Sequence, residues 1–292
     1  MKKLMFTAAV AAAMGAFAIE SANTVGYTTR TVNNQYRLAG GQFEAVGGDT
    51  FTLANLAVSA PATVNAWVTY DETLDEFYDN VSGWDQRAPM IQIPDASGNY
   101  TPYYYIADTR DANDQNAGAG WANGGGYAVD PTITAGLGVW VLGYRNGDAA
   151  VADTTLTFSG EVNGDNSQNI SLANGYMLRA VPYPKALALN GENVANWSVL
   201  TAVNAWVTYD ETLDEFYDNV SGWDQNAPVI QIPDANGNYT PYYYVADARD
   251  GSDQNAGAGW VNGGGYLVDA TIPVGTGIWF DGRKTVNVPI YK

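Results

Sequence analysis

Hydrophobic and polar residues alternate in short runs along most of the chain, and this period of two predicts β-strands. Residues 66–70 are aromatic and β-branched, and the polar stretch 71–75 separates them from residues 76–78. This arrangement predicts a β-hairpin. Further short strands are expected at residues 132–133, 139–142 and 156–158. Because a helical period is hard to find after the N-terminal stretch, the pattern favours an all-β fold of short antiparallel strands.

A second hairpin is predicted from residues 90–107. Residues 90–93 and 100–107 have strand character, and the loop between them contains Asp95 and Gly98. Aspartate at the first position and glycine at the fourth suit a type I turn closed by a glycine bulge. We therefore expect the two strands to pair across this turn.

Residues 64–140 occur a second time as residues 203–279, without a gap and with 14 differences in 77 positions. We call this near-identical block the cassette. A repeat of this length decides the domain count. It predicts two tandem sandwich-like β domains, residues 19–162 and residues 163–292, each of normal domain size.

Weaker correspondences extend the repeat beyond the cassette. Residues 36–38 match 176–178, residues 54–55 with Val58 match 195–196 with Val199, and residues 155–158 can be set against 285–288. The flanks 27–63 and 165–202 otherwise share only scattered positions. A functional difference between the domains is therefore expected in the flanks, and a shared binding surface is expected twice, on the cassette.

The N-terminus has the features of an export signal. Lys2 and Lys3 precede a short apolar stretch, and Ala16-Phe17-Ala18 fits the small-x-small cleavage pattern. We expect residues 1–18 to be cleaved and the mature protein to be secreted or otherwise extracytoplasmic, in the periplasm, on the cell surface or outside the cell. The stretch is too short for a stable membrane span, so no transmembrane segment is expected in the mature chain.

The chain is acidic, with 31 acidic and 13 basic residues and a net charge of −18. Nucleic acid is not expected as a partner, because binding a polyanion draws on clustered lysine and arginine. Two interpretations of the charge stay open: solubility of an exported protein, and binding of cations. The pattern indicates no particular oligomeric state.

Catalysis is not expected. The chain has no histidine and no cysteine, which excludes Ser-His-Asp and Cys-His nucleophile systems and histidine-ligated zinc or iron. The glycine-rich residues 123–127 lack the lysine and the helix of a phosphate-binding loop, so they indicate a turn. We expect no cofactor, with Ca²⁺ as the one alternative.

That alternative comes from an acidic loop in each copy. Its candidate metal ligands are Asp108, Asp111 and Asp114, with Asp247, Asp250 and Asp253 in the second copy. Carboxylates together with side-chain amides supply the hard oxygen ligands that Ca²⁺ prefers. The spacing is not that of an EF-hand, and Arg110 lies inside the cluster. The competing interpretation is a solvated loop whose Asp and Asn side chains bond to their own backbone.

A second group of carboxylates lies in the first hairpin of each cassette. Its members are Asp71, Glu72, Asp75, Glu76 and Asp79, with Asp210, Glu211, Asp214, Glu215 and Asp218. Paired carboxylates perform glycoside hydrolysis, one as acid and one as nucleophile or base. A solvated turn explains the same residues and is the favoured interpretation.

Aromatic residues form the most suggestive set for ligand binding. The candidates are Trp84, Tyr103, Tyr105 and Trp121, with Trp223, Tyr242, Tyr244 and Trp260. They are spaced by polar side chains, a mixture suited to stacking on sugar rings and bonding their hydroxyls. The alternative is core packing, with the polar atoms of the rings satisfied at the rim.

Three short patterns carry a resemblance. Residues 25–28 (Val-Gly-Tyr-Thr), 136–140 (Gly-Leu-Gly-Val-Trp) and 156–161 (Leu-Thr-Phe-Ser-Gly-Glu) together resemble exported bacterial tandem β-repeat proteins. The resemblance covers most of both units and implies export and an all-β fold. That group has no established activity, so the resemblance transfers no functional residue.

The sequence therefore favours an exported, acidic, non-catalytic structural or interaction module. The alternative is a bivalent module that binds carbohydrate or is stabilised by Ca²⁺, since two like domains on one chain raise avidity for a repeated ligand. Its partner would be a glycan or another surface protein. A glycoside hydrolase that uses the hairpin carboxylates is the third hypothesis.

Overall fold

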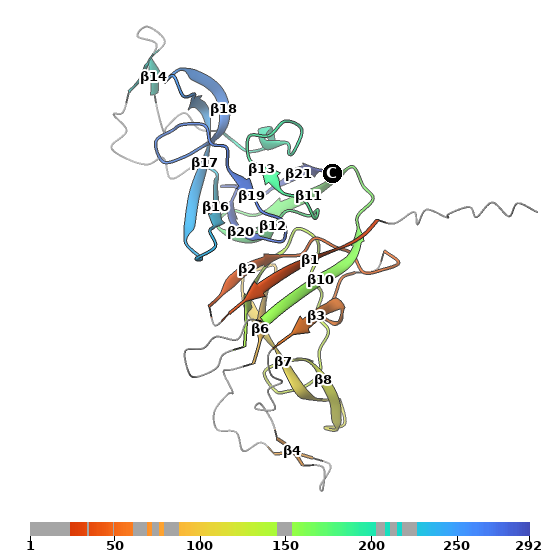
Figure 1. The fold of residues 1–292 in the computed structure, drawn as a ribbon. Coiled ribbons are helices and arrows are strands. Elements are labelled where there is room, and N and C mark those ends of the chain that lie inside the picture. Colours follow the sequence, from red (N-terminus) through yellow and green to blue (C-terminus); the bar gives the residue numbers. More distant parts are fainter. Residues whose placement is uncertain are drawn as a thin grey trace, which may run out of the picture.

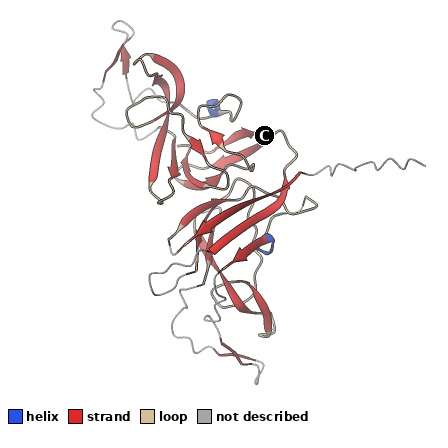
Figure 2. Cartoon of the chain, in the orientation of Figure 1, coloured by secondary structure: helices blue, strands red, loops and turns tan. Residues whose placement is uncertain are grey.

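The computed structural model confirms an all-β chain. It describes residues 24–33, 35–48, 50–60, 88–144, 154–202 and 227–292, together with the backbone of 69–71, 76–78, 208–210 and 215–217. The predicted signal peptide, residues 1–18, lies outside the described residues. Strands make up nearly all of the regular structure, and two single 3₁₀ turns are the helical elements of the described part (Figure 2).

The first unit is a sandwich of a five-stranded and a three-stranded antiparallel sheet. The larger sheet has the order β2 (Arg37–Gly40), β9 (Gly138–Leu142), β6 (Met90–Pro94), β7 (Tyr100–Arg110) and β8 (Asn116–Ala122). The smaller sheet has the order β1 (Thr24–Val32), β10 (Thr154–Val162) and β3 (Leu56–Ser59), and the turn η1 (Leu53–Asn55) precedes β3. The short pair β4 (Thr69–Asp71) and β5 (Glu76–Tyr78) forms a separate hairpin.

The second unit repeats this plan. Its five-stranded sheet has the order β12 (Met177–Ala180), β20 (Gly277–Asp281), β16 (Val229–Pro233), β17 (Tyr239–Arg249) and β18 (Asn255–Val261). The opposite layer contains the pairs β11 (Ser167–Leu172) with β21 (Val286–Tyr291) and β13 (Leu187–Ala188) with β19 (Thr271–Ile272), beside the turn η2 (Trp197–Val199). The separate hairpin recurs as β14 (Thr208–Asp210) and β15 (Glu215–Tyr217).

Strand alternation builds the core of each unit. In β10 the side chains of Leu156 and Phe158 are buried, and the residues between them are not. Phe158 stacks on Phe51 with ring centroids 6.0 Å apart, which ties the three-stranded layer to the loop before η1. Burial of large aromatic and branched side chains in this way stabilises the sandwich without disulfides.

Both hairpins predicted in the cassette are confirmed. β4 pairs with β5 so that Asp71 faces Glu76, and β6 pairs with β7. In the second hairpin Gly98 N–H donates to the Asp95 carbonyl at 3.1 Å, and Gly98 has φ of +83°. This is the type I turn with a glycine bulge that the sequence predicts.

The flanks align differently from the sequence prediction. In the first unit Leu53 N–H donates to the Pro131 carbonyl, and in the second Leu189 N–H donates to the carbonyl of Ala270, the cassette equivalent of Pro131. Leu53 therefore corresponds to Leu189, and Ala54 corresponds to Asn190. The predicted match of residues 54–55 with 195–196 is wrong, because backbone pairing determines the correspondence and the second unit carries a longer connection after this point.

The two units pack around an approximate two-fold axis (Figure 1). Gly40 N–H in β2 donates to the Gly275 carbonyl of the second unit, and Ala180 N–H in β12 donates to the Gly136 carbonyl of the first. Residues 40 and 180 are equivalent, as are residues 136 and 275, so one hydrogen bond is the symmetry mate of the other. The equivalent rings of Trp140 and Trp279 meet edge to face at 6.1 Å.

This interface depends on two equivalent glycines. A Cβ atom added at Gly138 would lie 2.7 Å from the Arg179 carbonyl oxygen, and one added at Gly277 would lie 2.6 Å from the Ala39 carbonyl oxygen. Backbone cannot yield as a flexible side chain does, so only glycine fits at these positions. One edge strand of each five-stranded sheet, β2 or β12, thereby lies against the other unit.

Replacing either glycine by alanine should force the units apart. We expect Gly138→Ala and Gly277→Ala each to lower the free energy of unfolding by about 1–3 kcal/mol, the usual cost of overpacking. Denaturant unfolding measures this. Gly164→Ala is the matched control, because no atom of the described residues lies within 4 Å of a Cβ at that glycine. Unfolding midpoints equal to that of the control would contradict the tight interface.

Candidate functional site

Each unit extends one long two-stranded arm. In the first unit the arm is β7 with β8, and its register shifts between Ile106 and Thr109. Ala107 and Asp108 form this β-bulge, and Gly118 opposite has φ of +88°. A bulge increases the local twist and re-aims the strand. The equivalent arm, β17 with β18, has the same shift between Val245 and Ala248.

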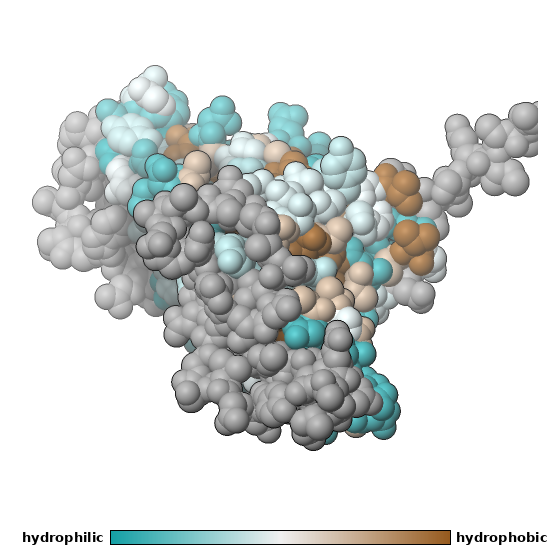
Figure 3. Space-filling view, turned by 60° about the horizontal axis from the view of Figure 1, so that its bottom comes forward, coloured by the Kyte–Doolittle hydropathy of each residue, from teal (hydrophilic) through white to brown (hydrophobic). Residues whose placement is uncertain are grey.

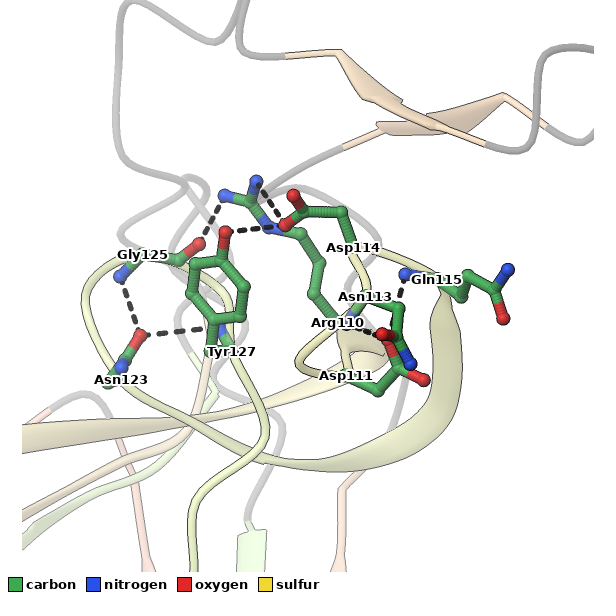
Figure 4. Close-up of polar contacts among 8 residues, drawn as sticks. All are labelled: Arg110, Asp111, Asn113, Asp114, Gln115, Asn123, Gly125 and Tyr127. Carbon is green, nitrogen blue, oxygen red and sulfur yellow. Dashed lines mark hydrogen bonds and ion pairs between the residues drawn. The ribbon is translucent and has the colours of Figure 1, made fainter.

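The tip of the arm is closed by an arginine, a tyrosine and an aspartate (Figure 4). The guanidinium of Arg110 lies 4.6 Å from the ring centroid of Tyr127 and 3.8 Å from a carboxylate oxygen of Asp114. The Tyr127 hydroxyl donates to the same carboxylate oxygen, and Arg110 donates to the Gly125 carbonyl. Asp114 is held at φ of +59° by these contacts, a conformation that L-residues rarely adopt.

The second arm has the same closure. Arg249 lies 4.4 Å from the ring centroid of Tyr266 and 3.8 Å from a carboxylate oxygen of Asp253, and the Tyr266 hydroxyl donates to Asp253. Asp253 has φ of +61°. The arm tip is thus one local structure that the chain forms twice.

Asp111 organises the turn of the acidic loop. Its carboxylate accepts hydrogen bonds from the backbone N–H groups of Asn113 at 2.7 Å and Gln115 at 3.1 Å. These bonds stabilise the ionised form, and the pKa of Asp111 is lowered, with the bond from Gln115 as the largest cause. Asp250 accepts the equivalent bonds from Ser252 and Gln254.

Asp108 sits apart from the other carboxylates, in the bulge. It is half-buried, and one of its carboxylate oxygens is buried without a hydrogen-bond partner. Burial raises the pKa of Asp108 to about 6. Asp247 in the second arm has the same environment and the same raised pKa, also about 6.

The candidate metal ligands are therefore not gathered into one site. Asp111 bonds the loop backbone, Asp114 bonds Arg110 and Tyr127, and Asp108 lies in the bulge. Over the described part of the chain, no group of three acidic side chains is placed to hold a metal ion. The loop has the form of the alternative interpretation, in which Asp and Asn side chains bond their own backbone.

The aromatic candidates lie mainly in the cores. Trp121 and Tyr244 are nearly buried, and Trp260 is completely buried. Trp260 packs edge to face against Trp197 with centroids 5.2 Å apart. These three rings cannot stack on a sugar from solvent, so the sugar-binding hypothesis is wrong for them. The packing of the two sheets determines where these rings lie, and the polar residues beside them in the sequence do not.

The other aromatic candidates have intermediate positions. Three of them are half-buried against the cores: Tyr103, Tyr105 and Tyr242. The ring centroids of Tyr105 and Trp121 lie 5.5 Å apart. The intervening Tyr104 packs on the opposite face, against a small cluster that includes Ile106. Trp84 and Trp223 lie outside the described residues, as do most of the hairpin carboxylates.

A cleft of about 470 Å³ lies where the two units meet. From the first unit Tyr103 and the turn at Asp95 line it, and from the second unit Asn169, Ser171 and Arg179 line it. Arg179 donates through Nε to the Ser171 carbonyl at 2.6 Å, which holds its guanidinium against the wall. A half-buried ring beside a cation, an amide and a hydroxyl is suited to a small polar ligand.

Sequence reasoning found only Tyr103 among the residues of this cleft. Asn169, Ser171 and Arg179 belong to the diverged flank of the second unit, which has no motif of its own. They meet the cassette only because the two units pack together, and no spacing in the sequence signals that contact.

If the acidic loops bound Ca²⁺, the metal would have to displace the donors that Asp111 and Asp114 already accept. We therefore expect millimolar Ca²⁺ to leave the melting temperature unchanged, since a ligand that binds only the folded state must raise it. Thermal melts with Ca²⁺ and with a chelator measure this. A rise that disappears in Asp111→Asn with Asp250→Asn would show that the loops bind the metal.

The raised pKa of Asp108 and Asp247 has a predictable effect on stability. The folded state holds these protons more tightly than the unfolded state, in which the pKa is about 3.9, so the two carboxyls lower stability as pH rises from about 4 to about 6. We expect the double variant Asp108→Asn with Asp247→Asn to have a higher melting temperature than the wild type at neutral pH. At about pH 4 the two melting temperatures should be equal.

Asp111→Asn is the control of opposite sign. The lowered pKa of Asp111 contributes stability at neutral pH that is lost as pH falls. This variant should therefore melt below the wild type at neutral pH and approach it in acid. Melting curves over this pH range decide both, and a pH-independent difference in either variant would contradict the assignment.

Within the described residues no helix is long and apolar enough to cross a membrane. Searches against protein-family models, curated proteins and solved structures found no match.

Proposed function

We propose that the protein is an exported, non-catalytic interaction module that displays the same arm tip twice on one rigid body. The observation that carries this proposal is the approximate two-fold interface. Its paired backbone hydrogen bonds and closely packed glycines join the units without a flexible linker. The arms β7–β8 and β17–β18 consequently point toward opposite ends of the molecule (Figure 1).

The arm tips have properties of a presented surface. Residues 112–117 are exposed, and the loop that they form is braced from inside by Asp111, Asp114 and Arg110. Bracing lowers the entropy that the loop would lose on binding, which favours recognition by a rigid tip. Two tips on one body raise avidity for a repeated partner, provided that the partner's spacing matches.

The chemistry of the tips favours binding over catalysis. The charge of Arg110 is opposed by Asp114, and the carboxylate of Asp111 is bonded to backbone. Charged groups that are satisfied in this way hold a shape and do not serve as free acids or bases. On the face drawn in Figure 3 the brown, hydrophobic residues of the described part lie near the centre and the right side, with teal and white residues beside them.

A second candidate function is binding of a glycan or another small polar ligand in the cleft between the units. Tyr103 offers a ring face there, and Asn169 and Arg179 offer hydrogen-bond donors. This candidate differs from the bivalent carbohydrate-binding module that the sequence suggests, because the cleft combines residues of both units and would bind one ligand.

The bivalent proposal is tested by blocking the tips. The chain has no cysteine, so Ala112→Cys and Gly251→Cys can each be capped with a bulky maleimide polymer. Ala112 is exposed, and over the part of the chain that the structure describes no atom lies within 4 Å of a Cβ at Gly251. We expect one capped tip to speed dissociation of fluorescent protein from intact producing cells, and two capped tips to abolish retention. Capping at Gly164→Cys is the control.

Retention that is unchanged with both tips capped would overturn the bivalent proposal. The cleft candidate is tested separately on a glycan array with Tyr103→Ala, and with Tyr242→Ala as the matched ring outside the cleft. Binding that Tyr103→Ala removes and Tyr242→Ala keeps would support the cleft. Arrays on which the wild type gives no signal would reject it.

A further inference from the structure

The two units differ at the outer edge of β8. In the second unit a Cβ added at Gly259 would lie 2.5 Å from Leu267 Cδ2 and 3.2 Å from Asn190 Oδ1. At the equivalent Gly120 the one neighbour within 4 Å among the described residues is Thr109 Cγ2, at 3.7 Å. The same backbone is therefore covered in the second unit and open in the first.

The open side is a groove of about 530 Å³. It runs between η1 with β3 and the arm, and its walls include Leu56, Tyr105, Ala117, Ala119, Trp121 and Ala128. Its volume falls in the range of ordinary ligand sites, about 300–1,000 Å³. Ala128 stands where the second unit has Leu267, so the first unit lacks the side chain that would fill the space.

The second unit fills its counterpart with an amide group. Asn190 donates from Nδ2 to the Trp260 carbonyl at 2.8 Å, and its Oδ1 accepts from Trp260 N–H at 2.9 Å. A carboxamide that donates to and accepts from one residue reproduces what a peptide group of a neighbouring strand does. Ala54 is the equivalent of Asn190 and has no polar side-chain atom, so it makes no such pair with Trp121.

The second unit also packs an aromatic side chain against Trp260. Trp197 is the first residue of η2 and lies with its ring centroid 5.2 Å from that of Trp260. Its Nε1 donates to the Leu189 carbonyl at 2.7 Å, which fixes the ring in place. The second unit thus shows which groups complete this site: a peptide-like amide flanked by bulky apolar side chains.

We propose that the groove of the first unit binds an extended peptide segment that carries a bulky apolar side chain. Its backbone amide pairs with Trp121, as Asn190 pairs with Trp260. Its apolar side chain fills the space that Leu267 occupies in the second unit. Val129 N–H already donates to the Trp121 carbonyl at 2.9 Å, as Val268 N–H does to the Trp260 carbonyl at 3.2 Å. The peptide therefore supplies a second donor to that carbonyl, as Asn190 does in the second unit. Main-chain bonds of this kind supply affinity, and side-chain pockets supply specificity.

The proposal is independent of the arm tips and can be tested on the mature chain. The probe is the blocked peptide acetyl-Thr-Val-Trp-Val-Thr-amide, and binding is followed by the backbone amide signal of Trp121 in NMR titrations. We expect saturable binding to the wild type. A peptide with serine in place of tryptophan, and a peptide methylated at the central amide nitrogen, should each bind at least ten-fold more weakly.

The decisive variant gives the first unit the residues of the second, Ala54→Asn with Ala128→Leu. We expect it to fold and to bind the peptide at least ten-fold more weakly than the wild type. Ser97→Asn is the matched control, because it also installs a second-unit residue but lies in the β6–β7 turn, away from the groove. It should bind as the wild type does.

The converse variant, Asn190→Ala with Leu267→Ala, should open the second unit and raise the stoichiometry from one peptide toward two. The proposal fails if no peptide binds at millimolar concentration, or if the filled variant binds like the wild type. It also fails if the methylated peptide binds like its parent. Sedimentation of the wild type as a dimer and of the filled variant as a monomer would instead assign the groove to a second copy of the chain.

Discussion

The close approach of backbone to backbone at Gly138 and Gly277 is the constraint on which the rest of the molecule depends. Each glycine faces a carbonyl of the other unit at a distance that leaves no room for a Cβ atom. The approach brings Gly40 and Ala180 into hydrogen-bonding range of the opposite unit. The edge strands β2 and β12 lie against the opposite unit as a result, and each donates a backbone hydrogen bond to it.

The remaining surfaces follow from this packing. The edge strands β2 and β12 lie at the interface, so the rest of each five-stranded sheet extends away from the axis and ends in its arm (Figure 1). The cleft at Tyr103 and Arg179 results from the same interface, since its two walls come from different units. One interface therefore determines both the direction of the arms and the position of the cleft.

The two units share a plan, but they fill it differently. The arms close with the same arginine, tyrosine and aspartate, at nearly the same distances. The sides of the arms differ, because the flank of the second unit contributes Asn190 and Trp197, whereas the first has Ala54 and a shorter connection. Duplication thus produced two equal tips, and beside Trp121 a groove that the described residues do not fill.

The sequence by itself determined the all-β class, the two units, both cassette hairpins and the glycine bulge at Gly98. These features depend on neighbouring residues, whose alternation and turn chemistry are local. Only the tertiary structure decided that Trp121 and Trp260 are core residues, that Asp108 is separated from Asp111, and that Leu53 corresponds to Leu189. Those facts depend on which strands pair and which sheets pack, contacts between residues far apart in the chain that no local pattern encodes.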